Sequence, residues 1–570
     1  MSNQGPRALD SASTPGLSRR SLLRMAAVAG VAVSGGAVLS ACSDSDSNKS
    51  VDVTLKLGGT PDAFPYTEMP SADERAKSPV REGYAVALQA WLDKNPGVKF
   101  SRINQDIWNA DAMKAAIAGD TAPAMYIGNA VAQWTVSQMT IAFGQGLVAD
   151  VAGPAKKHGY TDNLTPAAKP TSDFWTAALD GKLPGLLYET LGVGQGFYLR
   201  KDLLEKAGVQ VPEVGPDWNI DKWREIAKAV TSGPVRGVAM PTWGIWPILN
   251  QAGVTVVTDV PDPKSNWNVR SDWTYAKPSL LKALDTFRAM KFEDKSVLSD
   301  ASFAGKDDAL RDAFVSGKVA MWLANPAQLF ANPADPSSMT AVAKKLGKPL
   351  EQVITWVPFP IVEGLYSVDS KVGGAMVSFA PSLSKAELDK AVSLHAFMLR
   401  EGVQLSADTI YAKTKDLKDV YGASPSGGKL PVATVVPILN GPKLPGSLEE
   451  AYPGDLLKGF KADLARPAGP LREQYAVETN PGPPNKAWDD LVSTLHFNAG
   501  ADVRGEVDKA VSTWNSQSKG FKSAIDDGTF KKNMTNYYAA LDAYWKTNGP
   551  DFHANTFAPF YANAVKPALA

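Results

Sequence analysis

Cys42 is the only cysteine among the 570 residues of the chain. A single thiol cannot form a disulfide within the chain, so the folded part must be stabilised by a hydrophobic core without covalent cross-links. Cys42 follows Leu39-Ser40-Ala41, an apolar stretch from Met25 to Leu39, and the basic sequence SRRSLLR. A charged start, an apolar middle and small residues before a cysteine indicate a secretory signal that is cleaved ahead of a lipidated residue.

The arginine pair at 19–20 favours export by the twin-arginine route. The alternative is a retained transmembrane anchor, but a spanning helix needs about 20 apolar residues, and this stretch is shorter and contains three glycines. We therefore expect residues 1–41 to be a signal peptide and Cys42 to carry the lipid. Residues 42–50 form a polar, flexible spacer, so the folded body is expected at the extracellular face of the cell membrane.

Charge and histidine content exclude several classes of function. The chain has 59 basic and 59 acidic residues, and this neutral balance argues against a nucleic-acid partner. The four histidines are far apart in the sequence, which leaves no local zinc-type pair, and no calcium-binding loop is present. We expect no metal and no cofactor, and we interpret His395 as a core residue.

Strands and helices alternate from Val51 onward, which predicts an α/β fold with a mostly parallel sheet. One later helix is expected to start at Asn219, and Ser384 opens another with a capping box. The C-terminal part becomes helical after a segment rich in proline and glycine. The expected strands are 51–57, 98–103 and 124–127; the C-terminal helices are expected around 507–514 and 530–541.

Several segments, in order, resemble motifs of the extracellular solute-binding proteins of family 1, the carbohydrate-binding lipoproteins of ABC importers. Ala124 and Arg200 depart from the residues usual in that family. The resemblance covers most of residues 51–400, and its segments are NPGVKF at 95–100, AGDTAPAMY at 118–126, GKLPG at 181–185, GFYLRKDL at 196–203, Trp218 with Trp223, and AFVSGKVAM at 313–321.

The resemblance implies a periplasmic-binding-protein-like fold of two α/β lobes that close on a ligand about a hinge, with an extended helical C-terminal part. The expected first lobe is 51–187 plus 371–430, and the expected second lobe is 188–370 plus 431–570. The chain would cross between lobes near 188–194, 358–364 and 430–437. The implied function is capture of a saccharide, an oligosaccharide in preference to a monosaccharide, by a monomer that delivers it to an ABC permease.

A saccharide site needs flat aromatic rings for the C–H faces of the sugar and planar hydrogen-bonding groups for its hydroxyls. In open α/β sheets such ligands bind beyond the carboxyl ends of the strands. Candidates of both kinds follow expected strands, and each Trp or Asn has a packing or capping role as its alternative. We expect Trp322→Ala to abolish most of the affinity for the ligand and to leave the melting temperature almost unchanged. The candidate ligand-binding residues are Gln105, Asn129, Trp134, Trp243, Trp246, Trp322 and Asn325.

Motifs typical of enzymes are absent from the sequence. It contains no G-x-S-x-G, no H-E-x-x-H and no P-loop, and the glycine-rich segment 192–196 lacks the lysine of a nucleotide-binding loop. We therefore expect a binding protein. Two alternatives stay open: a cell-surface glycoside hydrolase, since paired carboxylates cannot be identified without geometry, and a peptide-binding or scaffold lipoprotein.

Overall fold

The structure is a computed structural model of the whole chain. The predicted signal peptide, Cys42 and the spacer lie outside the residues that it describes. It describes residues 52–58, 68–105, 110–127, 142–187, 196–241, 244–245, 248, 257–262, 268–298, 307–324, 339–362, 376–421, 437–452, 457–466, 469, 485–518 and 527–570.

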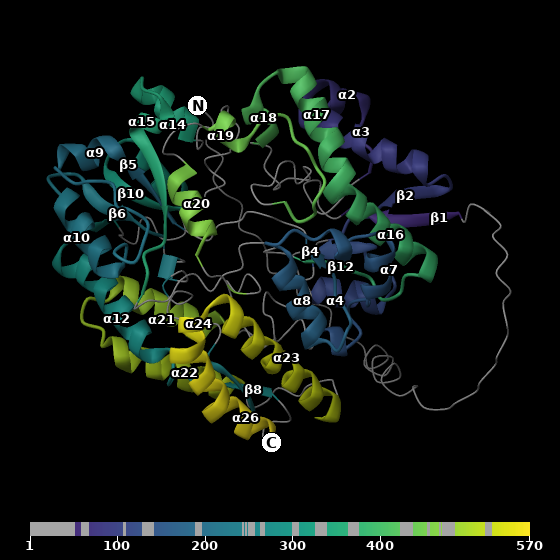
Figure 1. Cartoon of the computed structure of the whole chain (residues 1–570). Helices are drawn as coiled ribbons and strands as arrows, with labels where there is room; N and C mark the ends of the chain where they lie inside the picture. The colour runs from purple at the N-terminus through teal and green to yellow at the C-terminus, as the bar shows by residue number, and fades with distance from the viewer. Residues whose placement is uncertain are drawn as a thin grey trace, which may run out of the picture. The chain divides into compact units, whose positions relative to one another are not determined.

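The first body takes four strands from the first third of the chain and a fifth, β12, from much later in the sequence (Figure 1). Its strands are β1 (Val53–Leu57), β2 (Val98–Arg102), β3 (Met125–Ile127), β4 (Leu186–Leu187) and β12 (Met376–Phe379). Its helices are α2 (Ala72–Lys77), α3 (Pro79–Lys94), α4 (Ala110–Ala118), α7 (Ala152–Lys157), η1 (Thr161–Asn163), α8 (Lys169–Ala178), α16 (Lys385–Phe397), η7 (Met398–Gly402), α17 (Val403–Thr414), α18 (Leu417–Tyr421) and α19 (Leu448–Ala451).

The described strands of the first body form a two-stranded sheet of β1 and β2 and a three-stranded sheet of order 3-12-4. β1 pairs in parallel with β2, and β12 runs antiparallel to both β3 and β4. The two groups are joined because the backbone N–H of Ala124 donates to the carbonyl of Lys56 at 2.8 Å. Trp91 of α3 stacks on Phe100 of β2 and covers that end of the sheet. The expected strands at 51–57, 98–103 and 124–127 are confirmed.

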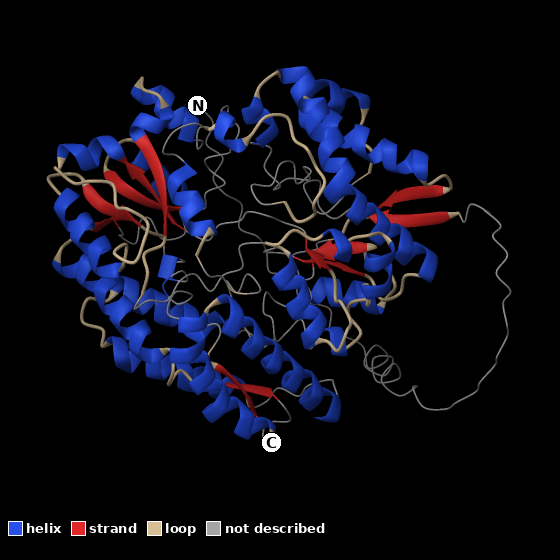
Figure 2. Ribbon diagram, in the orientation of Figure 1, coloured by secondary structure: helices blue, strands red, loops and turns tan. Residues whose placement is uncertain are grey.

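The second body is built on a five-stranded sheet of order 11-5-10-6-9 (Figure 2). Its strands are β5 (Gly196–Arg200), β6 (Arg236–Ala239), β9 (Val297–Leu298), β10 (Val319–Ala324) and β11 (Ile354–Pro358). Its helices are α9 (Lys201–Lys206), α10 (Ile220–Val230), α12 (Lys277–Arg288), η4 (Ala289–Glu293), α13 (Asp307–Val315), α14 (Met339–Leu346), α15 (Leu350–Val353) and α20 (Lys458–Leu464).

Helices cover both faces of this second sheet. β6, β9 and β10 are parallel, whereas β5 runs antiparallel between β10 and β11. Consecutive side chains of β5 point to opposite faces. Phe197 packs on Trp223 of α10, and Tyr198 lies on the other face together with Trp322, which contacts Phe314 of α13. A sheet buried on both faces needs continuous apolar strands, and β5, β10 and β11 are buried throughout.

A C-terminal module combines a hairpin from the middle of the chain with the last helices. Its strands are β7 (Asp259–Asp262) and β8 (Asn268–Ser271). Its helices are α21 (Asn485–Phe497), α22 (Val503–Ser518), α23 (Asp527–Asn548), α24 (Pro550–Phe552), η9 (His553–Phe557), α25 (Ala558–Phe560), η10 (Tyr561–Val565) and α26 (Lys566–Leu569). The side-chain amide of Asn515 pairs with both the N–H and the carbonyl of Ser271, which satisfies the outer edge of β8.

Two predicted helix starts are confirmed by their cap geometry. The Asn219 side chain accepts hydrogen bonds from the N–H groups of Asp221 and Lys222 at the start of α10. Ser384 and Glu387 form the reciprocal capping box that opens α16. Each cap satisfies backbone donors that the first helical turn leaves unpaired, which is why the sequence pattern could locate both helices.

Residues 437–452 pack on the first body, although the sequence-based boundary placed them in the second lobe. The Thr165 hydroxyl donates to the carbonyl of Pro437 at 2.7 Å, and the N–H of Asn440 donates to the carbonyl of Asn163 at 2.8 Å. The Tyr421 hydroxyl donates to the carbonyl of Gly446. The following helix, α20, packs instead on β11 of the second body. A segment rich in proline and glycine has no hydrophobic periodicity that could indicate its neighbour.

Candidate functional site

The carboxyl ends of β1 and β2 form one edge at which a ligand site can be built. Pairing continues one residue past β2, since the N–H of Ile103 donates to the carbonyl of Leu57 at 3.0 Å. Gly58 follows β1 with a φ of 114°, and a Cβ atom there would lie 2.9 Å from the carbonyl oxygen of Ile103. The backbone therefore turns at this edge in a conformation and at a distance that suit glycine.

Gln105 is one of two predicted ligand-binding residues that the structure describes. It lies two residues beyond Ile103, at the carboxyl edge of the first sheet, and is half-buried. A planar amide in this position has both a donor and an acceptor for hydroxyl groups. Its contact with a ligand stays a prediction.

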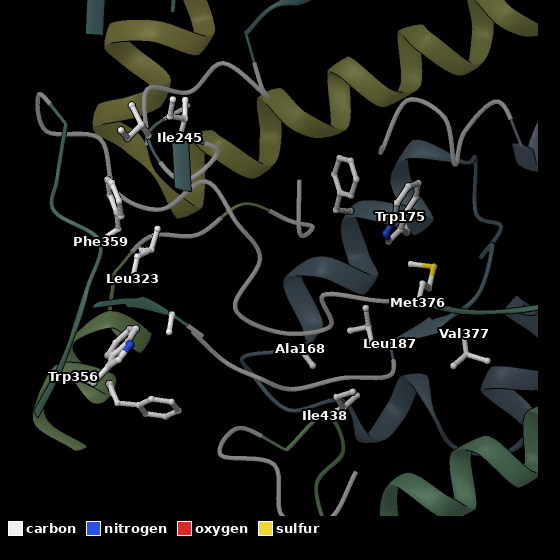
Figure 3. Packing of buried hydrophobic residues seen from close by; sticks show 14 of the residues in the cluster. Ala168, Trp175, Leu187, Ile245, Leu323, Trp356, Phe359, Met376, Val377 and Ile438 are labelled. Carbon is white, nitrogen blue, oxygen red and sulfur yellow. The ribbon is translucent and has the colours of Figure 1, made fainter. Parts of the chain in front are cut away.

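The second sheet has a matching edge where β6, β9, β10 and β11 end. The segment after β6 turns back over this edge: the N–H of Gly244 donates to the carbonyl of Pro241 at 2.9 Å. A Cβ atom on Gly244 would lie 2.2 Å from Met240 and 2.8 Å from Leu323, so this glycine is packed directly against the ends of β6 and β10. Ile245 is buried beside it (Figure 3).

Trp322, the second described candidate, is a core residue. Its side chain is 6% exposed, and its ring packs against Tyr198 at 5.8 Å and against Phe314 at 5.8 Å between centroids. Removing this indole would leave a cavity between β5, β10 and α13. The expected neutral effect of Trp322→Ala on the melting temperature is therefore replaced by a large loss of stability, because β10 is buried on both faces. Contact between Trp322 and a ligand stays a prediction.

The other predicted residues lie outside the described part of the chain. They are Asn129, Trp134, Trp243, Trp246 and Asn325, together with the lipidation candidate Cys42. Gly244 and Ile245, the described neighbours of Trp243 and Trp246, lie at the carboxyl edge of the second sheet.

The backbone that leaves β11 is anchored by two buried side chains that the sequence did not single out as site residues. The indole N–H of Trp218 donates to the carbonyl of Pro358 at 2.7 Å, and Arg466 donates to the carbonyl of Phe359 at 3.0 Å. The N–H of Ile361 donates to the carbonyl of Trp218 at 2.9 Å. These bonds fix the first residues of the predicted crossing 358–364 to the second body. In the sequence, only the family resemblance indicated Trp218, and no pattern indicated Arg466.

The end of β4 is anchored in a similar way on the first body. The N–H of Leu187 donates to the Tyr160 hydroxyl at 2.8 Å, and its carbonyl accepts a hydrogen bond from Nε2 of His395 at 3.1 Å. His395 is fully buried, which lowers its pKa from 6.5 to about 4, while the hydrogen bond to Leu187 opposes this shift. The imidazole is therefore neutral at physiological pH, and the interpretation of His395 as a core residue is confirmed.

The described residues contain neither a group of metal-ligating side chains nor a membrane-spanning helix. No group of three or more His, Cys, Asp or Glu side chains among them is arranged to hold a metal ion. None of the described helices is both long enough and apolar enough to cross a membrane.

Residues 105–366 match the family model described as bacterial extracellular solute-binding protein. This stretch begins at Gln105, just after β2, and includes the whole of the second sheet, so it contains the second of the two edges described above. No curated protein matches the chain. Residues 105–366 thus resemble the bacterial extracellular solute-binding proteins, and the resemblance predicted from the sequence is confirmed.

Solved structures with a similar fold are two-lobe binding proteins. The galacto-N-biose-/lacto-N-biose I-binding protein of the ABC transporter from Bifidobacterium longum is 12% identical, with a TM-score of 0.51 over 84% of this chain and 100% of that chain. The cyclic alpha-maltosyl-1,6-maltose binding protein from Arthrobacter globiformis is 16% identical, with a TM-score of 0.50 over 78% of this chain and 97% of that chain. The predicted two-lobe α/β fold is confirmed.

Proposed function

We propose that the protein is a lipid-anchored extracellular binding protein that captures a saccharide between its two lobes and delivers it to an ABC import permease. The observation that carries the proposal is the match of residues 105–366 to the extracellular solute-binding family. Within this stretch, candidate amide and indole side chains follow the carboxyl ends of strands in two separate sheets. Two α/β bodies that each contribute one edge are suited to holding a solute between them.

A saccharide is the solute class that best fits these candidates. Gln105, Asn129 and Asn325 supply planar amides for hydroxyl groups, and Trp134, Trp243 and Trp246 supply apolar rings for the faces of the sugar. The two structures of similar fold described above are named as binders of lacto-N-biose and of a cyclic maltosyl-maltose. The neutral net charge of the chain also agrees with an uncharged solute.

The lobe boundaries that we propose follow the contacts of the structure. The first lobe takes 51–187 and 371–452, because 437–452 pack on the first body. The second lobe takes 188–370 and 457–570, and we propose that the protein acts as a monomer. Cleavage before Cys42, its lipidation and export by the twin-arginine route remain part of this proposal, based on residues 1–42.

A thermal-shift screen of the purified chain against a panel of mono- and oligosaccharides tests the binding function. Binding to the folded state raises the melting temperature by mass action, so at least one saccharide should raise it without being turned over. Release of new reducing ends from an oligosaccharide would replace the proposal with a glycoside hydrolase. A response to peptides and to no saccharide would replace it with the peptide-binding alternative.

The lipid anchor is tested separately by Cys42→Ser. Without the thiol no lipid can be attached, so the protein should move from the membrane fraction to the medium, and the lipid-modified N-terminal peptide should disappear from mass spectra. Cys42 is the only cysteine, so no disulfide is affected by the change. An unchanged membrane fraction would contradict lipidation and favour the retained apolar anchor.

A further inference from the structure

Helix α23 packs against α8 of the first body through an aromatic cluster. Phe174 of α8 meets Tyr537 edge to face at 5.8 Å between centroids and Tyr544 at 6.2 Å. Tyr537 and Tyr544 are seven residues apart and therefore share one face of α23. Lys532 of the same helix forms an ion pair with Asp180, just after α8, at 2.7 Å. Figure 1 shows α23 beside α8.

A different face of α23 is attached to the hairpin of the C-terminal module. The hydroxyl of Tyr538, the neighbour of Tyr537, donates to the backbone carbonyl of Asp259 in β7. Tyr538 also packs on Phe560. The ring of Phe560 in turn meets that of Tyr275 edge to face at 5.7 Å between centroids, and Tyr275 lies two residues before α12. Adjacent residues on a helix point about 100° apart, so Tyr537 and Tyr538 contact separate partners.

The rest of the C-terminal module is tied to the second body. Arg288 at the end of α12 donates to the carbonyls of Leu495 and Ala499 at 2.8 Å, which fixes the connection between α21 and α22. Lys277 of α12 forms an ion pair with Asp508 of α22. The module therefore moves with the second body, while α23 extends from it to the first.

We propose that α23 is a strap that restrains the movement of the first body relative to the second, with Phe174 as its anchor on the first body. A helix of 22 residues is a stiff element, so its two attachments cannot move independently. Movement that separates α8 from α23 exposes Phe174, which is now 3% exposed, and breaks its two ring contacts with α23. The strap thus resists movement of α8 away from the second body.

The test measures the distance between the two bodies by double electron–electron resonance without any ligand. Nitroxide labels are placed on the full chain at Ala115→Cys in α4 and Glu205→Cys in α9, two exposed positions on different bodies. Cys42→Ser removes the only native thiol. We expect Phe174→Ala to broaden the distance distribution and shift its maximum, and Lys532→Ala to do so less, because its ion pair is exposed.

Phe552→Ala is the matched control. Phe552 belongs to the same module and meets Trp545 edge to face at 4.7 Å, so its loss should lower the melting temperature and leave the distance distribution unchanged. If Phe174→Ala fails to fold, Phe174→Leu keeps apolar volume and removes only the ring contacts. An unchanged distribution in the Phe174 variants, or equal broadening in Phe552→Ala, overturns the proposal. Because no saccharide is used, this result is independent of the proposed function.

Discussion

Two strands, β1 of the first body and β10 of the second, differ in how their side chains are buried. In β1 of the first body burial alternates: Val53, Leu55 and Leu57 are buried, and Thr54 and Lys56 are exposed. In β10 of the second body all six residues are buried. When apolar and polar residues alternate along a strand, the sequence predicts which side chains face the core. A continuous apolar strand gives no such prediction. An aromatic residue in β10 is therefore a packing residue, even near the carboxyl end of the strand.

The largest expected effect is that of Trp322→Ala on the second sheet. Truncation of a buried indole costs about 3–5 kcal/mol, because a cavity remains between β10 and α13. Urea denaturation measures the loss of unfolding free energy. Gln105→Ala, at the half-buried edge of the first sheet, is the control and should change stability little. An unfolding free energy that stays the same in Trp322→Ala would contradict the packing role of this residue.

Gly196→Ala tests the close approach of β5 and β11 in the same sheet. A Cβ atom at this position would lie 2.2 Å from the ring of Trp356 and 2.3 Å from the carbonyl oxygen of Val357. Overpacking of this kind costs about 1–3 kcal/mol. Gly153→Ala in α7 of the first body has open space around it and should be neutral or stabilising in the same thermal unfolding assay. Equal effects of the two changes would contradict the packing of β5 on β11.

The pH dependence of stability compares the histidines of two regions. His395 in the first body and His496 in the C-terminal module have pKa values lowered by burial, from 6.5 to about 4 and about 3. Between pH 6.5 and the lowered pKa values, the unfolded chain binds protons at these histidines and the folded chain does not. The contribution of the two histidines to the unfolding free energy is therefore full above pH 6.5 and is lost as the pH falls toward 4. For His395 the loss is about 3 kcal/mol, at 1.36 kcal/mol per pKa unit.

His395→Gln should remove its part of this slope, because glutamine does not titrate and its amide can still donate to the carbonyl of Leu187. The measurement is the unfolding free energy as a function of pH. The slope that remains belongs in part to His496. A slope unchanged in His395→Gln would mean that this imidazole is already accessible to protons in the folded state.

The smallest expected changes in stability come from two helix caps, one in each body. Ser384→Ala and Asn219→Ala should each lower the unfolding free energy by about 1 kcal/mol, whereas Ser384→Gly should cost only a few tenths. Thermal unfolding measures all three. If alanine and glycine at position 384 were equivalent, the capping box would contribute no stability in the folded protein.

Local patterns predicted a considerable part of the fold. The caps at Asn219 and Ser384, the strands around 51–57, 98–103 and 124–127, and the C-terminal helices were all located from residue type and spacing. Of the candidate site, the sequence located the described edges at Gln105 and Gly244, since the carboxyl ends of strands follow from the strand assignment. Contacts between distant segments could not be predicted, because no pattern within one segment specifies its partner.

The sequence by itself determined the α/β class, the absence of disulfides and the family motifs, since each depends on residues that are neighbours in the chain. Only the tertiary structure decided that Trp322 is packed between two rings, that residues 437–452 belong to the first body, and that α23 reaches α8. These outcomes depend on which apolar surfaces meet. Burial of apolar surface would stabilise many different pairs of segments. Only the pairs whose shapes fit and whose polar groups find hydrogen-bond partners form in the folded chain.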